Sequence, residues 1–294
     1  MANKPREPTA RQVRLGRVLK SLRVDGEHGS QDSIAASLGW SESKLSRIES
    51  AKVGVTDDDL KQLLDLYGMA DDADQSAYIW QLKRGGSQSG WESKVRRAVS
   101  PAYADYIGYE DYAVEASSVE TVLIPGLLQT RDYTATILDQ HLPDLSKKER
   151  EDRLAIRERR RAVFSRTDPL IFWGVVSESV LRHAICPHEV MADQLDYVLT
   201  LCQEHPHNIN LLVLPESAAS HAALFGGSFV ILSFPERWEP DIVYVEGLTS
   251  TQFIEDSPEV RAYEQLFRRL MADALRGTES LEVVQKYRDI YSKG

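Results

Sequence analysis

The sequence predicts an α+β protein in which a bundle of five helices precedes a mixed α/β domain. Three observations indicate this class. The first 84 residues show only helical spacing of apolar residues, a short segment rich in glycine and serine follows them, and β-rich runs then alternate with helical stretches. The length of 294 residues agrees with two domains, at roughly 150 residues each.

The predicted bundle opens with an amphipathic helix over residues 9–23, whose apolar side chains recur at intervals of three and four. Shorter helices follow, and each begins near a Ser or Thr that can accept a hydrogen bond from the first turn. These helices are 30–38 with Ser30 as its cap, 42–50 after Ser41, 56–67 beginning at Thr56, and 71–84.

Residues 85–90 hold three glycines and two serines, a composition with high backbone freedom and no core to contribute. We therefore predict a helical domain over 9–84, a linker over 85–90 and a second domain over 91–294. In the second domain the helical stretches are 91–111, 131–164, 187–203 and 257–292, and the β-rich runs are 170–176, 209–214, 228–234 and 241–245.

The charge is distributed unevenly along the chain. The whole chain has a formal net charge of −10, but residues 1–52 hold ten Lys or Arg against six Asp or Glu, which leaves +4 there and −14 in the remainder. Such asymmetry indicates that the basic N-terminal region binds a polyanion and that the acidic remainder of the chain would be repelled by it.

Several classes of protein are disfavoured by the composition. Two cysteines cannot form a secreted disulfide framework, which indicates a reducing, cytoplasmic compartment. No run of eighteen apolar residues occurs, so we expect no membrane span. The chain lacks a Gly-x-Ser-x-Gly elbow and both phosphate-binding glycine motifs. We therefore expect no enzyme and no cofactor.

Two groups of residues that combine cysteine with histidine are the sequence candidates for a metal site. Thiolate and imidazole are zinc ligands, but neither group has an established zinc spacing, and the predicted helix between them would hold them roughly 25 Å apart. Small buried thiols and polar helix ends are favoured instead, so no metal is expected. The groups are His183, Cys186 and His188, and Cys202, His205 and His207.

Residues 31–49 carry the clearest functional signal. Two short predicted helices are joined by a turn at Gly39, with the small Ala35 where they cross. This segment resembles the helix-turn-helix of the xenobiotic-response-element (XRE) and phage-repressor family. The resemblance implies a lambda-repressor-like domain that binds double-stranded DNA, with its second helix in the major groove. The alternative is a helical hairpin that only packs.

On the second helix, Leu45 and Ile48 are expected in the core, so the remaining positions face outward. Arg47 can pair bidentately with guanine, Lys44 can reach guanine or phosphate, and the others can accept or donate hydrogen bonds at base edges. The predicted base-reading residues are Glu42, Ser43, Lys44, Ser46 and Arg47.

The same resemblance implies roles for residues around that helix. Gln31 matches a position that holds phosphate, and Lys52 is expected to help through its charge. Arg23 and Glu49 match an internal ion pair that is structural. Ala51 stands where the family has a glycine after the recognition helix, so we expect that helix to run longer, towards Gly54.

The segment from Ile124 to Thr130, Ile-Pro-Gly-Leu-Leu-Gln-Thr, followed by Arg-Asp-Tyr133, resembles the opening of the C-terminal domain of WhiJ-like actinobacterial regulators. That resemblance implies a transcription factor controlled by a small ligand or by a small partner protein encoded nearby, in an antitoxin-like arrangement. Leu127, Leu128 and Tyr133 are themselves expected to pack in the core, because apolar residues at helical spacing usually do.

Together these features predict a cytoplasmic, nucleoid-associated regulator that binds DNA as a homodimer and is controlled through its C-terminal domain. Dimerisation is expected because one recognition helix reads only a few base pairs. The alternative is an antitoxin-like protein whose main role is to bind a partner, with DNA binding for autoregulation. An enzymatic C-terminal domain would need a pocket of converging polar groups, for which Glu178, Glu246 and Glu255 are the sequence candidates.

Overall fold

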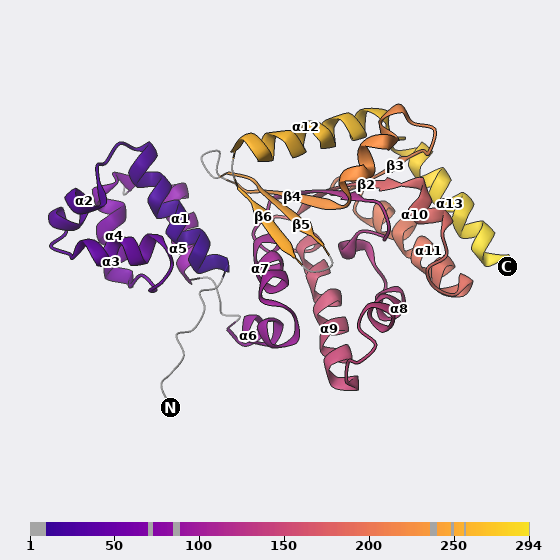
Figure 1. Ribbon diagram of the computed structural model, residues 1–294, viewed down its shortest axis with the longest axis horizontal. Coiled ribbons are helices and arrows are strands. Elements are labelled where there is room, and N and C mark those ends of the chain that lie inside the picture. The colour runs from indigo at the N-terminus through magenta and orange to yellow at the C-terminus, as the bar shows by residue number, and fades with distance from the viewer. Residues whose placement is uncertain are drawn as a thin grey trace. The chain divides into compact units, whose positions relative to one another are not determined.

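The structure is a computed structural model that describes residues 10–69, 73–84, 89–235, 240–247, 250–255 and 257–293. Its contacts divide the chain into two compact units, and along the sequence the division falls between Tyr109 and Glu110. Figure 1 shows helices alone in the first unit and a sheet with helices in the second. This confirms the predicted α+β class.

Within the first 84 residues, the described ranges 10–69 and 73–84 form five α-helices, as predicted. Ser30 and Thr56 cap the second and fourth, since their hydroxyl oxygens accept hydrogen bonds from the N–H groups of Ser33 and Asp59. The core of the bundle includes Leu19, Leu45 and Leu60, all fully buried. The helices are α1 (Ala10–Asp25), α2 (Gln31–Ser37), α3 (Glu42–Glu49), α4 (Asp57–Leu66) and α5 (Ala73–Arg84).

The expectation of a longer recognition helix is wrong. Helix α3 ends at Glu49, and Ala51 takes the left-handed conformation, with φ of 56°, that the missing glycine would have supplied. The Val53 N–H donates a hydrogen bond to the Arg47 carbonyl at 3.2 Å, which closes the turn. The helix therefore stops in a tight αL turn, which an alanine adopts here at a conformational cost.

The helical stretch expected over 91–111 is two helices, α6 (Ser89–Ala98) and α7 (Pro101–Glu110). The break precedes Pro101, which lacks an N–H donor and disfavours helical geometry in the residue before it. Of the linker expected over 85–90, residues 85–88 lie outside the described residues. Ser89 and Gly90 belong to α6.

The second unit is built on one six-stranded sheet in the order β3-β2-β1-β4-β5-β6. Strands β1, β2 and β3 run parallel, and β4, β5 and β6 pair antiparallel from β1 outward. Strands β1 and β6 were not predicted. The strands are β1 (Glu115–Glu120), β2 (Ile171–Ser177), β3 (Ile209–Leu214), β4 (Phe229–Ser233), β5 (Ile242–Glu246) and β6 (Thr251–Ile254).

Two of the helical stretches predicted for this unit are each divided into separate helices. The stretch over 131–164 breaks between His141 and Lys147, around Pro143, and the stretch over 257–292 breaks at Gly277, whose φ is 51°. The α-helices are α8 (Arg131–His141), α9 (Lys147–Arg160), α10 (Glu178–Arg182), α11 (His188–Glu204), α12 (Ser257–Asp273) and α13 (Thr278–Ser292), with 3-10 turns η2 (Gly126–Leu128), η3 (Arg161–Phe164) and η4 (Ala219–Gly226).

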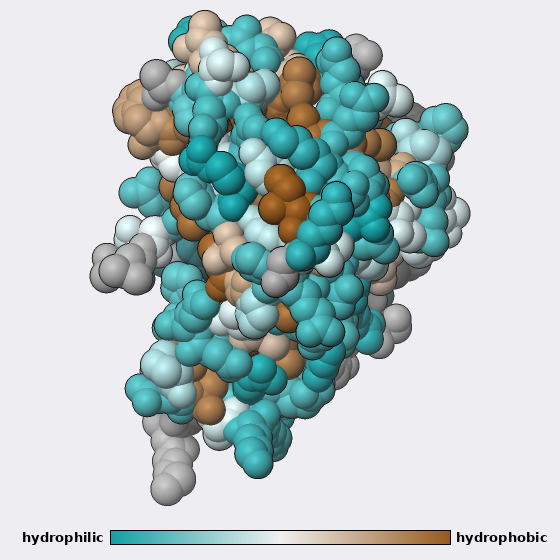
Figure 2. Space-filling model, turned by 90° about the vertical axis from the view of Figure 1, so that its right-hand side faces the viewer, coloured by the Kyte–Doolittle hydropathy of each residue, from teal (hydrophilic) through white to brown (hydrophobic). Residues whose placement is uncertain are grey.

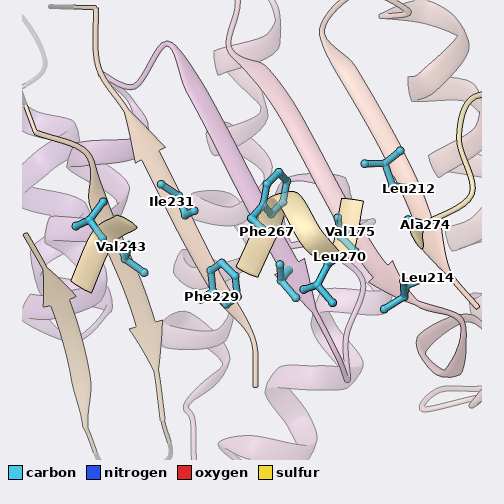
Figure 3. Packing of buried hydrophobic residues seen from close by; sticks show 11 residues of the cluster. Val175, Leu212, Leu214, Phe229, Ile231, Val243, Phe267, Leu270 and Ala274 are labelled. Carbon is cyan, nitrogen blue, oxygen red and sulfur yellow. The ribbon is translucent and has the colours of Figure 1, made fainter. Parts of the chain in front are cut away.

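Helix α12 covers one face of the sheet, and α9 and α11 lie on the opposite side (Figure 1). Figure 3 shows Phe267 and Leu270 of α12 directed at the sheet, beside Val175 of β2 and Phe229 of β4. All four side chains are buried. Figure 2 shows that on one outer face of the molecule hydrophobic residues appear only in small, separate patches among hydrophilic ones.

The segment that carries the WhiJ-like resemblance is part of the core. Leu127, Leu128 and Tyr133 are all at most 3% exposed, which confirms their predicted packing. Gln194 of α11, fully buried, donates to the Leu128 carbonyl and accepts from the Thr130 N–H, both at 2.7 Å. These hydrogen bonds connect the segment to α11. The residues of this sequence motif therefore contribute to packing inside the domain.

Candidate nucleic-acid interface

The turn between α2 and α3 is tight and internally hydrogen-bonded. Gly39 has a φ of 66°, a conformation that favours glycine. The N–H of Trp40 donates to the Ala35 carbonyl at 2.7 Å, and that of Gly39 donates to the Ala36 carbonyl at 3.1 Å. With Ala35 only 1% exposed at the crossing, this geometry sets the direction in which α3 leaves the turn.

Helix α3 presses its inner side against α1 at very short range. Leu45 and Ile48 are buried there. At Gly16 of α1, an added Cβ would lie 2.5 Å from the Glu49 carbonyl oxygen and 2.8 Å from that of Ile48. The two backbones therefore touch at Gly16. Sequence reasoning missed this residue, although a glycine inside a helical pattern was a signal of close packing.

The outer side of α3 presents Ser43 and Arg47, both exposed and one helical turn apart. The Arg47 Nε donates a hydrogen bond to the Ser43 carbonyl at 3.2 Å, so the guanidinium lies along the helix surface. Ser46 is half-buried. Glu42 is the first residue of α3, and its side chain lies outside the described ones. Of the predicted base-reading side chains that the structure describes, Ser43 and Arg47 are thus the exposed ones.

Lys44 is placed differently from the other predicted base-reading residues. Its Nζ lies 2.6 Å from the Asp59 Oδ1 and 4.0 Å from the centre of the Trp40 ring. Burial raises the pKa of Asp59, but hydrogen bonds from Lys44 and Thr56 outweigh that effect and lower it overall. The lysine charge is therefore engaged within the bundle, and Lys44 is not available to a base as it stands.

The ion pair expected between Arg23 and Glu49 is present and buried. The Arg23 Nε and Nη2 donate to the two carboxylate oxygens of Glu49 at 2.7 and 3.0 Å. This hydrogen bonding raises the pKa of Arg23. A further bond from the Arg23 Nη1 to the Gly29 carbonyl, at 3.1 Å, holds the loop before α2. The pair thus connects α1, that loop and the end of α3.

Gln31 joins this cluster. Its Nε2 donates to the Glu49 Oε2 at 2.6 Å and the residue is half-buried. The predicted phosphate contact of Gln31 stays a prediction, because this amide nitrogen already has a partner inside the bundle. Lys52 follows the αL turn after α3 and is exposed, which agrees with a residue that meets phosphate through its charge.

Two of the three sequence-predicted glutamates of the second unit have different surroundings. Glu178 accepts a hydrogen bond from the Tyr287 hydroxyl at 2.9 Å, whereas Glu246 ends β5 and is exposed. Glu120 lies at the end of β1, where burial raises the pKa of its carboxyl group from 4.5 to about 7. Sequence reasoning missed Glu120 because it missed its strand.

Both cysteines are buried and lie outside any disulfide, and burial raises the pKa of each thiol to about 11.

Within the ranges that the structure describes, no three His, Cys, Asp or Glu side chains gather in a way that could hold a metal ion. A search of the same ranges finds no helix with the length and apolar character needed to cross a membrane.

Comparison with known families identifies both parts of the chain. Residues 14–77 match a helix-turn-helix domain, which covers most of α1, all of α2 to α4 and part of α5. Residues 103–286, more than half of the chain, match a domain of unknown function (DUF5753). No curated protein matches the chain, and no solved structure does.

Proposed function

The chain belongs to the family defined by that C-terminal domain of unknown function, and we propose that it is a sequence-specific transcriptional regulator that reads DNA through its helix-turn-helix. The observation that supports this most directly is the outer side of α3, where Ser43 and Arg47 are exposed next to a tight turn. A single helix of this kind fits the major groove, which is about 12 Å wide.

In the proposed complex, Arg47 reads a guanine edge and Ser43 a neighbouring base or phosphate. Lys52 contacts the backbone, and Gln31 joins it there if its amide turns away from Glu49. Arg23 and Glu49 position α3 and read no base. We propose an XRE-type protein without catalytic activity, which acts in the cytoplasm at the nucleoid.

We propose that the regulator works as a homodimer, because two recognition helices related by a twofold axis reach half-sites about 34 Å apart and multiply specificity. Control is assigned to the C-terminal domain, by a small ligand or by a small partner protein. The antitoxin-like alternative rests on the WhiJ-like resemblance alone, whose motif lies in the core at Leu127 and Leu128.

The test compares Arg47→Ala with Lys52→Ala. Operator DNA is first selected from genomic fragments with the full chain, and Kd is then measured by fluorescence anisotropy on operator and on random duplex. Arg47→Ala is expected to lose about 1–3 kcal/mol on the operator and to relax one base position, because it removes a bidentate base contact. Lys52→Ala is expected to weaken both duplexes alike.

Arg268→Ala is the matched control, since Arg268 is an exposed arginine on α12 of the second unit. It is expected to leave both affinities unchanged. Equal losses for Arg47→Ala and Lys52→Ala on both duplexes would overturn the assignment of α3 as the reading helix.

A further inference from the structure

One of the two edges of the sheet in the second unit is formed by strand β3. The backbone groups that face outward from this strand are hydrogen-bonded along only part of its length. In the parallel ladder of β3 with β2, the Phe172 N–H donates to the Asn208 carbonyl at 2.6 Å. In such a ladder alternate residues turn their N–H and C=O groups towards the neighbouring strand. Ile209, Leu211 and Val213 therefore turn theirs away from the sheet.

Both ends of this outward edge are satisfied by other parts of the chain. The Ile209 N–H donates to the His205 carbonyl at 2.9 Å. At the other end, the Val213 N–H donates to the Ser280 Oγ at 3.0 Å, and the Val213 carbonyl accepts from the Leu275 N–H at 2.9 Å. The turn between α12 and α13 thus closes the edge at Val213.

The middle of the edge has no such cover. Among the described residues, nothing hydrogen-bonds to the Leu211 N–H, the Leu211 carbonyl or the Ile209 carbonyl on the outward side, although Leu211 is only 6% exposed. Buried backbone groups are nearly always paired, so an unpaired set calls for an explanation. In order along the strand these groups form an acceptor, a donor and an acceptor.

A cavity of about 500 Å³ opens at this place, a volume in the range of small-molecule sites. It is lined mainly by apolar side chains from β2, β3, α11 and α13, among them Trp173, Cys202 and Leu281. Of the described residues that line it, Arg276 alone carries a charge and none is a carboxylate. Its Nη2 donates to the Met271 carbonyl at 3.0 Å, which uses one of the five N–H donors of a guanidinium.

A peptide strand does not fit this edge. Addition of a strand needs a run of unpaired backbone groups over several residues, and here the run is limited to the stretch between two satisfied ends. A compact molecule with a hydrogen-bonding edge fits it. The apolar lining suits a planar aromatic body, and the lone Arg276 suits one anionic group.

We propose that this cavity is a binding site for a small planar aromatic anion, whose acid group pairs with Arg276 and whose polar edge pairs with the Leu211 backbone. The inference deepens the small-ligand form of the proposed function. The test measures ligand binding in the absence of DNA. A negative result would therefore refute the ligand site without affecting the DNA-binding assignment, and a failure to bind DNA would not affect the ligand site.

The probe is 8-anilinonaphthalene-1-sulfonate, an aromatic anion with one N–H donor, titrated into the full-length chain by fluorescence. Arg276→Gln is expected to raise its Kd about tenfold, as for loss of one charge-assisted hydrogen bond. Arg268→Gln, which changes an exposed arginine outside the lining, is the matched control and is expected to leave Kd unchanged. Leu281→Trp fills the cavity and is expected to abolish binding, with circular dichroism as the check on folding.

The two cysteines supply a second measurement that needs no variant. Cys202 lines the cavity and Cys186 does not, although both are buried. Bound probe is expected to slow alkylation of Cys202 by N-ethylmaleimide severalfold, measured on peptides by mass spectrometry, and to leave Cys186 unaffected. The proposal is overturned if the probe does not bind, if Arg276→Gln binds it as the wild type does, or if bound probe leaves Cys202 unprotected.

Discussion

The Nζ of Lys44 on the recognition helix lies 2.6 Å from the Oδ1 of Asp59, in the first turn of the next helix. A cation that would otherwise face DNA is thereby paired within the same domain. Among the described side chains of α3, Arg47 is then the exposed cation, and we infer that Asp59 opposes binding of a polyanion. We infer that this ion pair limits how strongly the helix-turn-helix domain binds DNA of any sequence.

Replacing Asp59 with Asn is therefore expected to tighten binding to operator and random DNA alike. The freed Lys44 adds about one phosphate contact, so the slope of log Kd against log salt should increase by about 0.9. The measurement is anisotropy at several salt concentrations. Asp58→Asn removes the same charge from an exposed neighbour and is the control. An equal effect of both variants would show that only net charge matters.

The touching backbones at Gly16 predict a sharp steric limit. Gly16→Ala would gain about 1 kcal/mol of helix propensity, but its methyl group overlaps the Glu49 carbonyl, and overpacking costs about 1–3 kcal/mol. We expect net destabilisation and weaker DNA binding, because α3 is displaced. Thermal unfolding is the measurement. Gly54→Ala, where the nearest atom is 3.9 Å away, is expected to be tolerated. Unchanged stability of Gly16→Ala would contradict the close contact.

The turn after α3 predicts a stabilising substitution. Ala51 holds a φ of 56°, which costs an L-residue about 1–2 kcal/mol and a glycine almost nothing. Glycine also has more conformational entropy to lose from the unfolded chain, which offsets part of this gain. Ala51→Gly should therefore stabilise the helix-turn-helix domain by up to about 1 kcal/mol. Ala36→Gly, at an exposed position inside α2, should destabilise it. Chemical denaturation measures both, and a loss of stability in both would argue against the αL turn.

Glu120 predicts a dependence of stability on pH. Its folded-state pKa, about 7, lies above the ordinary 4.5, so the folded state favours the protonated form. Its contribution to stability is full below about pH 4.5 and is lost as pH rises through 7. Glu120→Gln should thus match the wild type at pH 4.5 and exceed it by roughly 2–3 kcal/mol at pH 8, where the wild-type carboxylate is buried and ionised.

Urea unfolding at the two pH values measures this difference. Glu282→Gln, at an exposed position on α13, is the control and should give the same difference from wild type at both. A pH-independent effect of Glu120→Gln would mean that the carboxylate is hydrated in the folded state.

The sequence by itself determined what depends on neighbours along the chain. Helical spacing located the helices of the helix-turn-helix domain, and capping residues such as Ser30 and Thr56 located their starts. The glycine turn at Gly39 and the buried Leu45 and Ile48 gave the helix-turn-helix. These features can be recognised in the sequence because hydrogen bonds and side-chain contacts in a helix join residues three or four positions apart.

The tertiary structure decided what depends on residues far apart. Strand β1 contains Ala116, Ser117 and Ser118, which have little preference for strands, and it exists because β2 and β4 pair with it on both sides. The partner of Lys44 likewise comes from another helix. The turn after α12 and the start of α13 close the sheet edge at Val213, which leaves the unpaired groups confined to the stretch around Leu211. Pairing across the fold leaves no periodic trace in the sequence, so only the assembled structure reveals which cation is engaged and which backbone is open.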